Sequence, residues 1–323
     1  MERLHLVRSE KNSGGAGTPR NIGLKYSYGQ YIFLMDADDT IVDTALDELY
    51  KTAEEFNADI VHCEKNFQAP DETATTDKKL LKEVFQSRND DAFVKAPTVI
   101  SNDVADKTKL FLEGKFWWAP WSHLIKRDLL MEQDIKFSNL SIADDLIFSF
   151  FIMIAAKKIV YVPSIVYVWR VLKNSNSREI SDPAKTVHRR AGDIFKGITL
   201  LDEFTGKFEF FKSHPDYKQS IFEFFTLNQL NYLYHIYAQI PAWQLDGLIR
   251  RELAEVKDKT ALTAFLFARM NLLNVQLLRA QNLLRQQPKE VQDFQRQNEI
   301  IQRQQAQIQE LQQQLRNVHD VFR

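Results

Sequence analysis

The sequence predicts an α/β domain followed by a helical region. Three observations lead to this prediction: two apolar runs flank an amphipathic segment, glycine becomes scarce further along, and the end of the chain is rich in glutamine. The first pattern is typical of a strand, helix, strand unit. We therefore expect an α/β domain over residues 1–178, a helical domain over 179–284, and a glutamine-rich helix over 285–323.

The α/β prediction depends mainly on residues 31–63. The run YIFLM, which begins at Tyr31, is continuously apolar, as expected for a strand covered on both faces. The segment DTALDELYKTAEEF follows with apolar residues at helical spacing, and its N-cap is expected at Asp43 or Thr44. ADIVHC, which ends at Cys63, indicates a second buried strand. Together these segments predict a βαβ unit.

Further elements are expected after this unit. Residues 68–95 are polar and indicate a surface excursion. The apolar segment from Leu146 to Ala156 ends at two lysines, well short of the ~20 residues of a membrane-spanning helix, so we expect a buried helix. KIVYVP and SIVYVWR are then expected to be two separate strands.

The last part of the chain carries a heptad pattern. Apolar residues recur every seven positions at Phe294, Ile301, Ile308, Leu315 and Phe322. This pattern is typical of a coiled coil, through which the chain would form a homo-oligomer. Glutamines interrupt the second seam, and a long helix docked on its own protein is the alternative interpretation.

Composition excludes several classes of protein. The chain has 323 residues and a formal net charge of −1, which gives no general attraction to nucleic acid. Its lone Cys63 excludes an intrachain disulfide and fits a reducing compartment. The residues after Met1 lack the apolar core of a signal peptide. We therefore expect a cytoplasmic protein with no nucleic-acid partner.

The stretch DADD directly follows the first predicted strand and concentrates three carboxylates, those of Asp36, Asp38 and Asp39. In α/β sheets, ligands bind where strands end, and hard oxygen ligands suit magnesium or manganese. Two other interpretations remain open from these residues. The acidic residues from Asp38 to Asp43 could simply cap the next helix. Alternatively, Asp36 could be the nucleophile, and Asp38 the acid/base, of a haloacid-dehalogenase-like phosphatase.

The residues upstream favour another chemistry. A glycine-rich turn is followed by Arg20 and Asn21, which open a short amphipathic helix expected to end at Gly29. With the strand and DADD, this order resembles the inverting family-2-type glycosyltransferases, which have a GT-A fold, a Rossmann-like nucleotide-diphospho-sugar transferase domain. The matching positions are Arg20, Asn21, Gly23, Gly29, Tyr31, Ile32, Leu34, Asp36, Asp38 and Asp39.

The resemblance continues downstream, up to about Ser177. APWSHLIKR is similar to the family's tryptophan segment, and Asp144 and Asp145 stand at its acidic pair. Asp144 replaces the usual glutamate, and His123 replaces a lysine, which removes a permanent positive charge. The family's first strands, which hold the nucleotide base and ribose, have no counterpart in the residues given.

The resemblance implies a metal-dependent transfer from a nucleotide-sugar donor. Asp36 would contact the donor, Asp38 would bind manganese or magnesium at the diphosphate, and Asp145, paired with Asp144, would be the general base. Further substrate contacts are implied for Asp39, Arg20, Asn21, Trp121 and His123.

The acceptor would be a surface polysaccharide or glycoconjugate, either a glycan or a lipid-linked glycan at the inner face of the membrane. An inactive, glycosyltransferase-like scaffold in polysaccharide assembly is the non-enzymatic alternative. The sequence does not indicate the donor sugar or the linkage.

Overall fold

The computed structural model describes residues 4–10, 13–70, 93–140, 143–171, 183–237, 273, 276–281 and 301–309. The chain divides into two compact units, residues 1–221 and 222–323. The first unit contains the whole sheet and the predicted site. The three-part division expected from the sequence stays a prediction.

The first unit is built on a mixed sheet, which confirms the α/β class. Among the described residues the sheet has six strands, with β4 paired beside β6. The neighbouring order is β1 (Tyr31–Phe33), β5 (His123–Lys126), β3 (Ile60–Pro70), β6 (Ile159–Val171) and β2 (Thr40–Ile41), with β4 at Thr98–Val99. β5 is antiparallel to both β1 and β3, so these two strands run the same way, as expected of the βαβ unit, but β5 lies between them.

The two strands expected after residue 158 are one continuous strand, β6, so that prediction was wrong. The reason is a bulge in its parallel pairing with β3. Cys63 lies opposite Val162 and Lys65 lies opposite Ile165, so one residue of β3 faces two of β6. Pro163, which has no backbone N–H for the ladder, lies in this bulge. The strand therefore continues past the proline.

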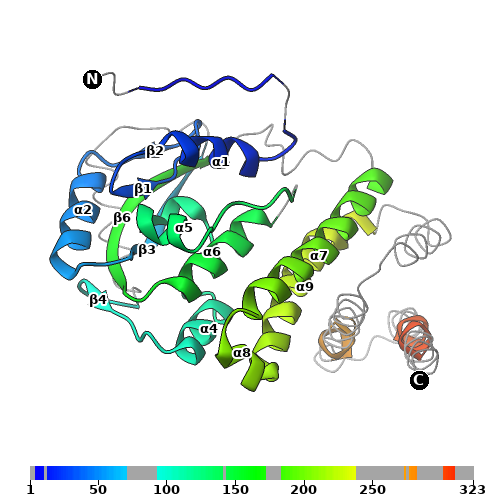
Figure 1. The fold of residues 1–323 in the computed structure, drawn as a ribbon. Coiled ribbons are helices and arrows are strands. Elements are labelled where there is room, and N and C mark those ends of the chain that lie inside the picture. The colour runs from blue at the N-terminus through cyan, green and yellow to red at the C-terminus, as the bar shows by residue number, and fades with distance from the viewer. Residues whose placement is uncertain are drawn as a thin grey trace. The chain divides into compact units, whose positions relative to one another are not determined.

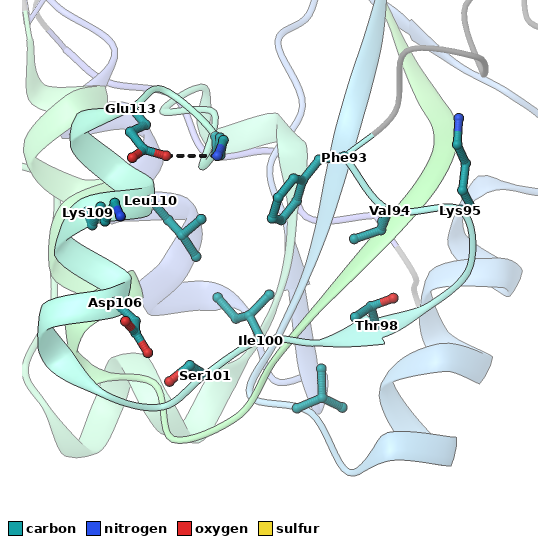
Figure 2. Close-up of a pocket in the computed structure, with 12 residues that line it drawn as sticks. Phe93, Val94, Lys95, Thr98, Ile100, Ser101, Asp106, Lys109, Leu110 and Glu113 are labelled. Atoms are coloured by element: carbon teal, nitrogen blue, oxygen red, sulfur yellow. Dashed lines mark ion pairs between the residues drawn. The ribbon is translucent and has the colours of Figure 1, made fainter.

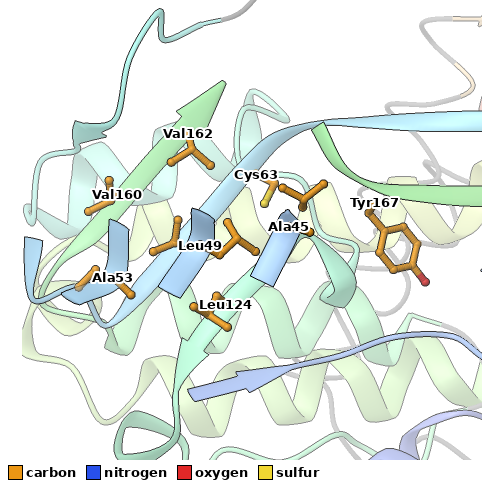
Figure 3. Close-up of a cluster of buried hydrophobic side chains, with 11 residues drawn as sticks. Ala45, Leu49, Ala53, Cys63, Leu124, Val160, Val162 and Tyr167 are labelled. Carbon is orange, nitrogen blue, oxygen red and sulfur yellow. The ribbon is translucent and has the colours of Figure 1, made fainter. Parts of the chain in front are cut away.

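Helix α2 (Ala45–Phe56) covers one side of the sheet, and α5 (Arg127–Glu132) and α6 (Asp144–Ala155) lie on the other (Figure 1). Thr44 is the N-cap residue of α2, as one of the two sequence alternatives predicted. Figure 3 shows the buried stripe of α2 meeting the sheet, with Leu49 and Ala53 packed beside Leu124 and Val160. Cys63 is a buried free cysteine in this cluster.

Helix α1 (Gly17–Tyr26) differs from its predicted bounds. It begins three residues before Arg20 and ends before Gly29. The backbone N–H and the hydroxyl of Ser27 both donate to the carbonyl of Leu24, at 3.3 and 2.7 Å, and this ends the helix. Gly29 therefore lies in the connection to β1 and is not the C-cap residue.

The apolar segment expected to be a buried helix is α6, whose residues are mostly buried. Its C-terminal carbonyls meet Lys107 of α4 (Val104–Leu112), a helix that the sequence analysis did not predict. The Nζ atom of Lys107 donates to the carbonyls of Ile154 and Ala156 at 3.0 and 2.9 Å. These bonds explain why a lysine is buried here, and burial lowers the pKa of Lys107 to about 8.

The remaining helices follow the sheet. The first unit also contains α7 (Pro183–Thr205), α8 (Glu209–Ser213), the short helix η3 (Pro120–Ser122) and the start of α9 (Pro215–Tyr237). In the second unit residues 301–309 are helical and Ile308 is buried. Phe294, Leu315 and Phe322 lie outside the described residues, so the heptad seam stays a prediction. Within the part of the chain that the structure describes, no helix has the length and hydropathy of a membrane span.

Candidate functional site

Three residues that are distant in sequence meet around one guanidinium group. Arg20 lies on α1, Asp36 lies in the connection between β1 and β2, and Asp145 lies in the first turn of α6. Arg20 Nη2 is 3.0 Å from Asp36 Oδ1, and Arg20 Nη1 is hydrogen-bonded to Asp145 Oδ1. The Arg20 side chain is 13% exposed, against 40% for Asp36 and 27% for Asp145. We call these three residues the Arg20 cluster.

Neighbouring residues fix α1 so that Arg20 reaches both carboxylates. The side-chain amide of Asn21 donates to the carbonyl of Phe137 and accepts from its N–H, each at 2.9 Å. The guanidinium carbon of Arg20 lies 5.1 Å from the centre of the Phe137 ring, a cation–π geometry. Gly17 lets α1 approach closely, because a Cβ there would lie 2.6 Å from the carbonyl oxygen of Ser138. Asn21 thus positions the helix that carries Arg20.

Burial dominates the electrostatics of the acidic pair. It raises the pKa of Asp145 to about 7; the charge of Arg20 opposes this shift, and the neighbouring Asp144 carboxylate adds to it. The pKa of Asp144 is also raised by burial. Although burial disfavours its charge, Arg20 has a raised pKa because Asp145 and Asp36 stabilise the cation. A carboxyl group that titrates near neutrality is suited to accept a proton.

Asp144 is at the N-terminus of α6, beside this cluster. Its Oδ1 atom accepts from the N–H of Asp145 at 3.0 Å, so one oxygen binds a backbone donor in the first turn of the helix. Its other oxygen, Oδ2, is buried and has no hydrogen-bond partner in the structure. A Cβ on Gly17 would lie 2.8 Å from that oxygen. The Asp144 carboxylate therefore lies against Gly17 of α1.

The DADD connection contains a contact that sequence reasoning missed. Tyr167, on β6, accepts a hydrogen bond from the N–H of Asp36 at 3.0 Å and donates one to Asp39 Oδ2 at 2.6 Å. Asp39 is buried, whereas Asp36 is partly exposed. Burial, together with the hydrogen bond to Asp39, raises the pKa of Tyr167 above its usual range. Asp39 accepts this bond inside the protein, and the substrate contact expected of it stays a prediction.

Asp38 is exposed in the same connection. Among the described residues, no group of three or more His, Cys, Asp or Glu side chains is arranged to hold a metal ion by itself. Magnesium in nucleotide sites is commonly held by one or two carboxylates together with substrate phosphates. The donor set at Asp36 and Asp38 fits that shared form of binding and does not form a closed protein cage.

The two candidate residues of the tryptophan segment, Trp121 and His123, have different surroundings. Trp121 is partly exposed and stacks on Tyr167, with ring centres 4.3 Å apart and planes at 11°, so one face of its indole is already covered. His123 is fully buried, with its Nδ1 atom 3.1 Å from Nδ1 of His62, and the ring of Phe116 stacks on it. Burial holds the pKa of His123 well below its ordinary value. A buried neutral histidine does not reach a substrate, and we leave His123 out of the proposed site.

A separate hollow of about 620 Å³ lies between α4 and the segment around β4. Figure 2 shows apolar side chains such as Phe93, Ile100 and Leu110 lining it, with Lys109 and the ion pair of Glu113 at its rim. It shares no residue with the Arg20 cluster. The predicted site residues do not line it.

The fold and the Arg20 cluster define an α/β protein with a carboxylate-rich site where β1 ends. Residues 1–110 match the family model "Glycosyl transferase family 2". The resemblance recognised in the sequence is thereby confirmed for residues 1–110.

Three curated relatives show how far this similarity extends. The poly(ribitol-phosphate) beta-N-acetylglucosaminyltransferase TarP of Staphylococcus aureus is 41% identical over 58 residues, 18% of each chain. The poly(ribitol-phosphate) beta-glucosyltransferase of Bacillus spizizenii is 26% identical over 203 residues, 62% of this chain and 28% of the relative. Glycosyltransferase GlyG of Streptococcus pneumoniae is 26% identical over 223 residues, 67% of this chain and 69% of the relative.

The chain therefore spans only a small part of the length of the first two relatives. Among solved structures, S. aureus TarS 1-349 in complex with UDP-GlcNAc aligns with a TM-score of 0.48 and 15% identity, covering 84% of this chain and 64% of that one. At that score and identity the likeness supports no conclusion about function.

Proposed function

We propose that this protein is a metal-dependent, inverting glycosyltransferase with a GT-A-type site. It would transfer a sugar from a nucleotide-sugar donor to a hydroxyl group of a cell-surface polysaccharide or glycoconjugate. The observation that carries the proposal is the Arg20 cluster, in which one cation joins Asp36 of the DADD connection to Asp145 of the distant acidic pair. Neither a phosphatase nor a simple helix cap requires one arginine to bond both of these aspartates.

The geometry of the Arg20 cluster supports the following proposed roles. Asp145 accepts the proton of the acceptor hydroxyl while that oxygen bonds to the anomeric carbon and the bond from that carbon to the diphosphate oxygen breaks. Its pKa of about 7 leaves a substantial ionised fraction near neutral pH. Arg20 holds Asp145 and Asp36 in place and supplies positive charge beside the departing diphosphate. A divalent cation bound by Asp38 and the diphosphate would add Lewis-acid stabilisation of the leaving group.

The acceptor class is inferred from the relatives. Two of them are named for transfer to poly(ribitol-phosphate), a polymer that presents hydroxyl groups between phosphates. An acceptor of this chemical kind, a hydroxyl-rich cell-envelope polymer, fits a general base at Asp145. Peripheral association with the membrane and oligomerisation through the C-terminal helix remain part of the proposal.

The test is donor turnover by the purified chain. A panel of nucleotide sugars is incubated with and without Mn²⁺, and release of the nucleoside diphosphate is measured. We expect cation-dependent turnover, which Asp145→Asn lowers by ~10²-fold or more, in line with the typical contribution of a general base. The matched control is Asp47→Asn, a charge removal at an exposed ion pair of α2. If no donor is turned over, the inactive scaffold becomes the better description.

A further inference from the structure

We propose that Tyr167 is a positioning residue of the proposed donor site, where its hydroxyl fixes the connection that carries Asp36 and Asp38. This inference rests on the proposed function, because it concerns the same donor site. Neither the family model nor the relatives' names point to this tyrosine.

The geometry shows how one hydroxyl holds both ends of the connection. The N–H of Asp36 donates to the Tyr167 oxygen at 3.0 Å, and the hydroxyl donates to Asp39 Oδ2 at 2.6 Å. The N–H of Asp39 also donates to the carbonyl of Asp36 at 3.2 Å, which closes a turn around Asp38. Asp38 is thus presented between two residues that are bonded to the same hydroxyl.

The tyrosine is itself held rigidly. Tyr167 is fully buried, and its backbone lies opposite Ile41 in the antiparallel pair of β6 and β2. Trp121 stacks on its ring with planes at 11°. A hydroxyl fixed by a strand and a stacked indole can hold a loop that would otherwise adopt several conformations.

The consequence is a selective effect on donor and metal binding. Asp36 belongs to the Arg20 cluster and Asp38 is the proposed metal ligand, so loosening their connection weakens both the donor and the cation site. The base, Asp145, is carried by a different element, α6, so the connection that the hydroxyl holds does not itself carry the base. Loss of the hydroxyl should therefore raise the donor KM and the Mn²⁺ concentration for half-activation, while kcat at saturation stays near that of the wild type.

Tyr167→Phe tests this, because it removes the hydroxyl and keeps the ring that stacks on Trp121. We expect both constants to rise by about 10- to 100-fold, the range for losing a hydrogen bond to a charged group. Direct titration of uridine diphosphate with Mn²⁺ by calorimetry should show the same weakening. Tyr161→Phe is the matched control, because the buried hydroxyl of Tyr161, on the same strand, has no hydrogen-bond partner among the described residues.

A double-mutant cycle separates positioning from a general loss of structure. Asp39→Asn alone should weaken donor binding, and combined with Tyr167→Phe it should cost much less than the sum of the two, since both act through one hydrogen bond. Additive effects, or a Tyr167→Phe enzyme that matches Tyr161→Phe in both constants, would overturn the inference. If the wild type neither binds uridine diphosphate nor turns over a donor, the proposed function fails, and this inference fails with it.

Discussion

Replacing Arg20 by methionine should shift the pH dependence of turnover and should not lower turnover equally at every pH. Arg20 is hydrogen-bonded to Asp145 and opposes the rise in the pKa of that carboxyl group to about 7. A cation at such a distance typically lowers the pKa of a carboxyl group by about one to three units. Without Arg20, the pKa of Asp145 should therefore lie at about 8 to 10.

The magnitude follows from the ionised fraction of the base. At pH 7 that fraction falls from about one half to between about 10% and 0.1%, so kcat/KM should fall by about 5- to 500-fold. The loss should shrink as the pH is raised, because the acidic limb of the profile moves upward. Steady-state kcat/KM across the pH range measures this directly.

Arg20→Lys is the control, since it keeps a positive charge and should leave the limb closer to its wild-type position. Arg20 is also a proposed donor contact, and loss of such a contact alone would lower kcat/KM by the same factor at every pH. A uniform loss, with no displacement of the acidic limb, would refute the assigned link between Arg20 and Asp145.

Three further predictions concern the packing and titration of the same unit. Gly17→Ala should lower donor turnover without changing a charge, because its Cβ would lie 2.6 Å from the carbonyl of Ser138 and must displace α1; turnover equal to wild type would contradict this. Lys107→Met should lower the unfolding free energy in urea by about 1–3 kcal/mol, since it leaves the buried carbonyl of Ile154 without its donor, and an unchanged midpoint would count against it. Burial raises the folded-state pKa of Asp145 to about 7, so the stability that its protonated form contributes is present at acidic pH and is lost as the pH rises from about 4 to about 7. Asp145→Asn should therefore flatten the decrease of the thermal unfolding midpoint over this pH range. An unchanged decrease would argue that burial of Asp145 does not cause it.

The sequence was sufficient for the elements whose signal is local. Apolar runs and helical spacing located β1, α2 and α6, and the order of the motifs indicated a family resemblance, which the comparison confirmed over residues 1–110. The meeting of Arg20 with Asp36 and Asp145 depends on how α1 is held against Phe137 and Ser138, which are distant in sequence, and the sequence did not predict it.

Tyr167 shows why other parts of the candidate site could not be predicted from the sequence. Strict alternation along β6 would put it on the opposite face from Val160 and Val162, yet it packs in the same cluster as both. The pairing register shifts between these positions, so the side-chain period is broken there. Pro163 was a visible signal of that irregularity, but it was interpreted as a strand end.

His123 shows what a motif position does not reveal. Its position in the family motif implied a substrate contact, but it is fully buried with the rings of Phe116 and His62 stacked on it, which is why the proposed site omits it. Motif position alone carries no information on burial, which is set by packing across distant segments.

The central claim is that a nucleotide sugar binds at the Arg20 cluster, and a crystal structure of the protein with uridine diphosphate and Mn²⁺ tests it most directly. We expect the diphosphate to lie within hydrogen-bonding distance of Arg20, with the cation between its oxygens and Asp38. A nucleotide bound elsewhere, for example in the hollow beside α4, with the Arg20 cluster unchanged, would contradict the account.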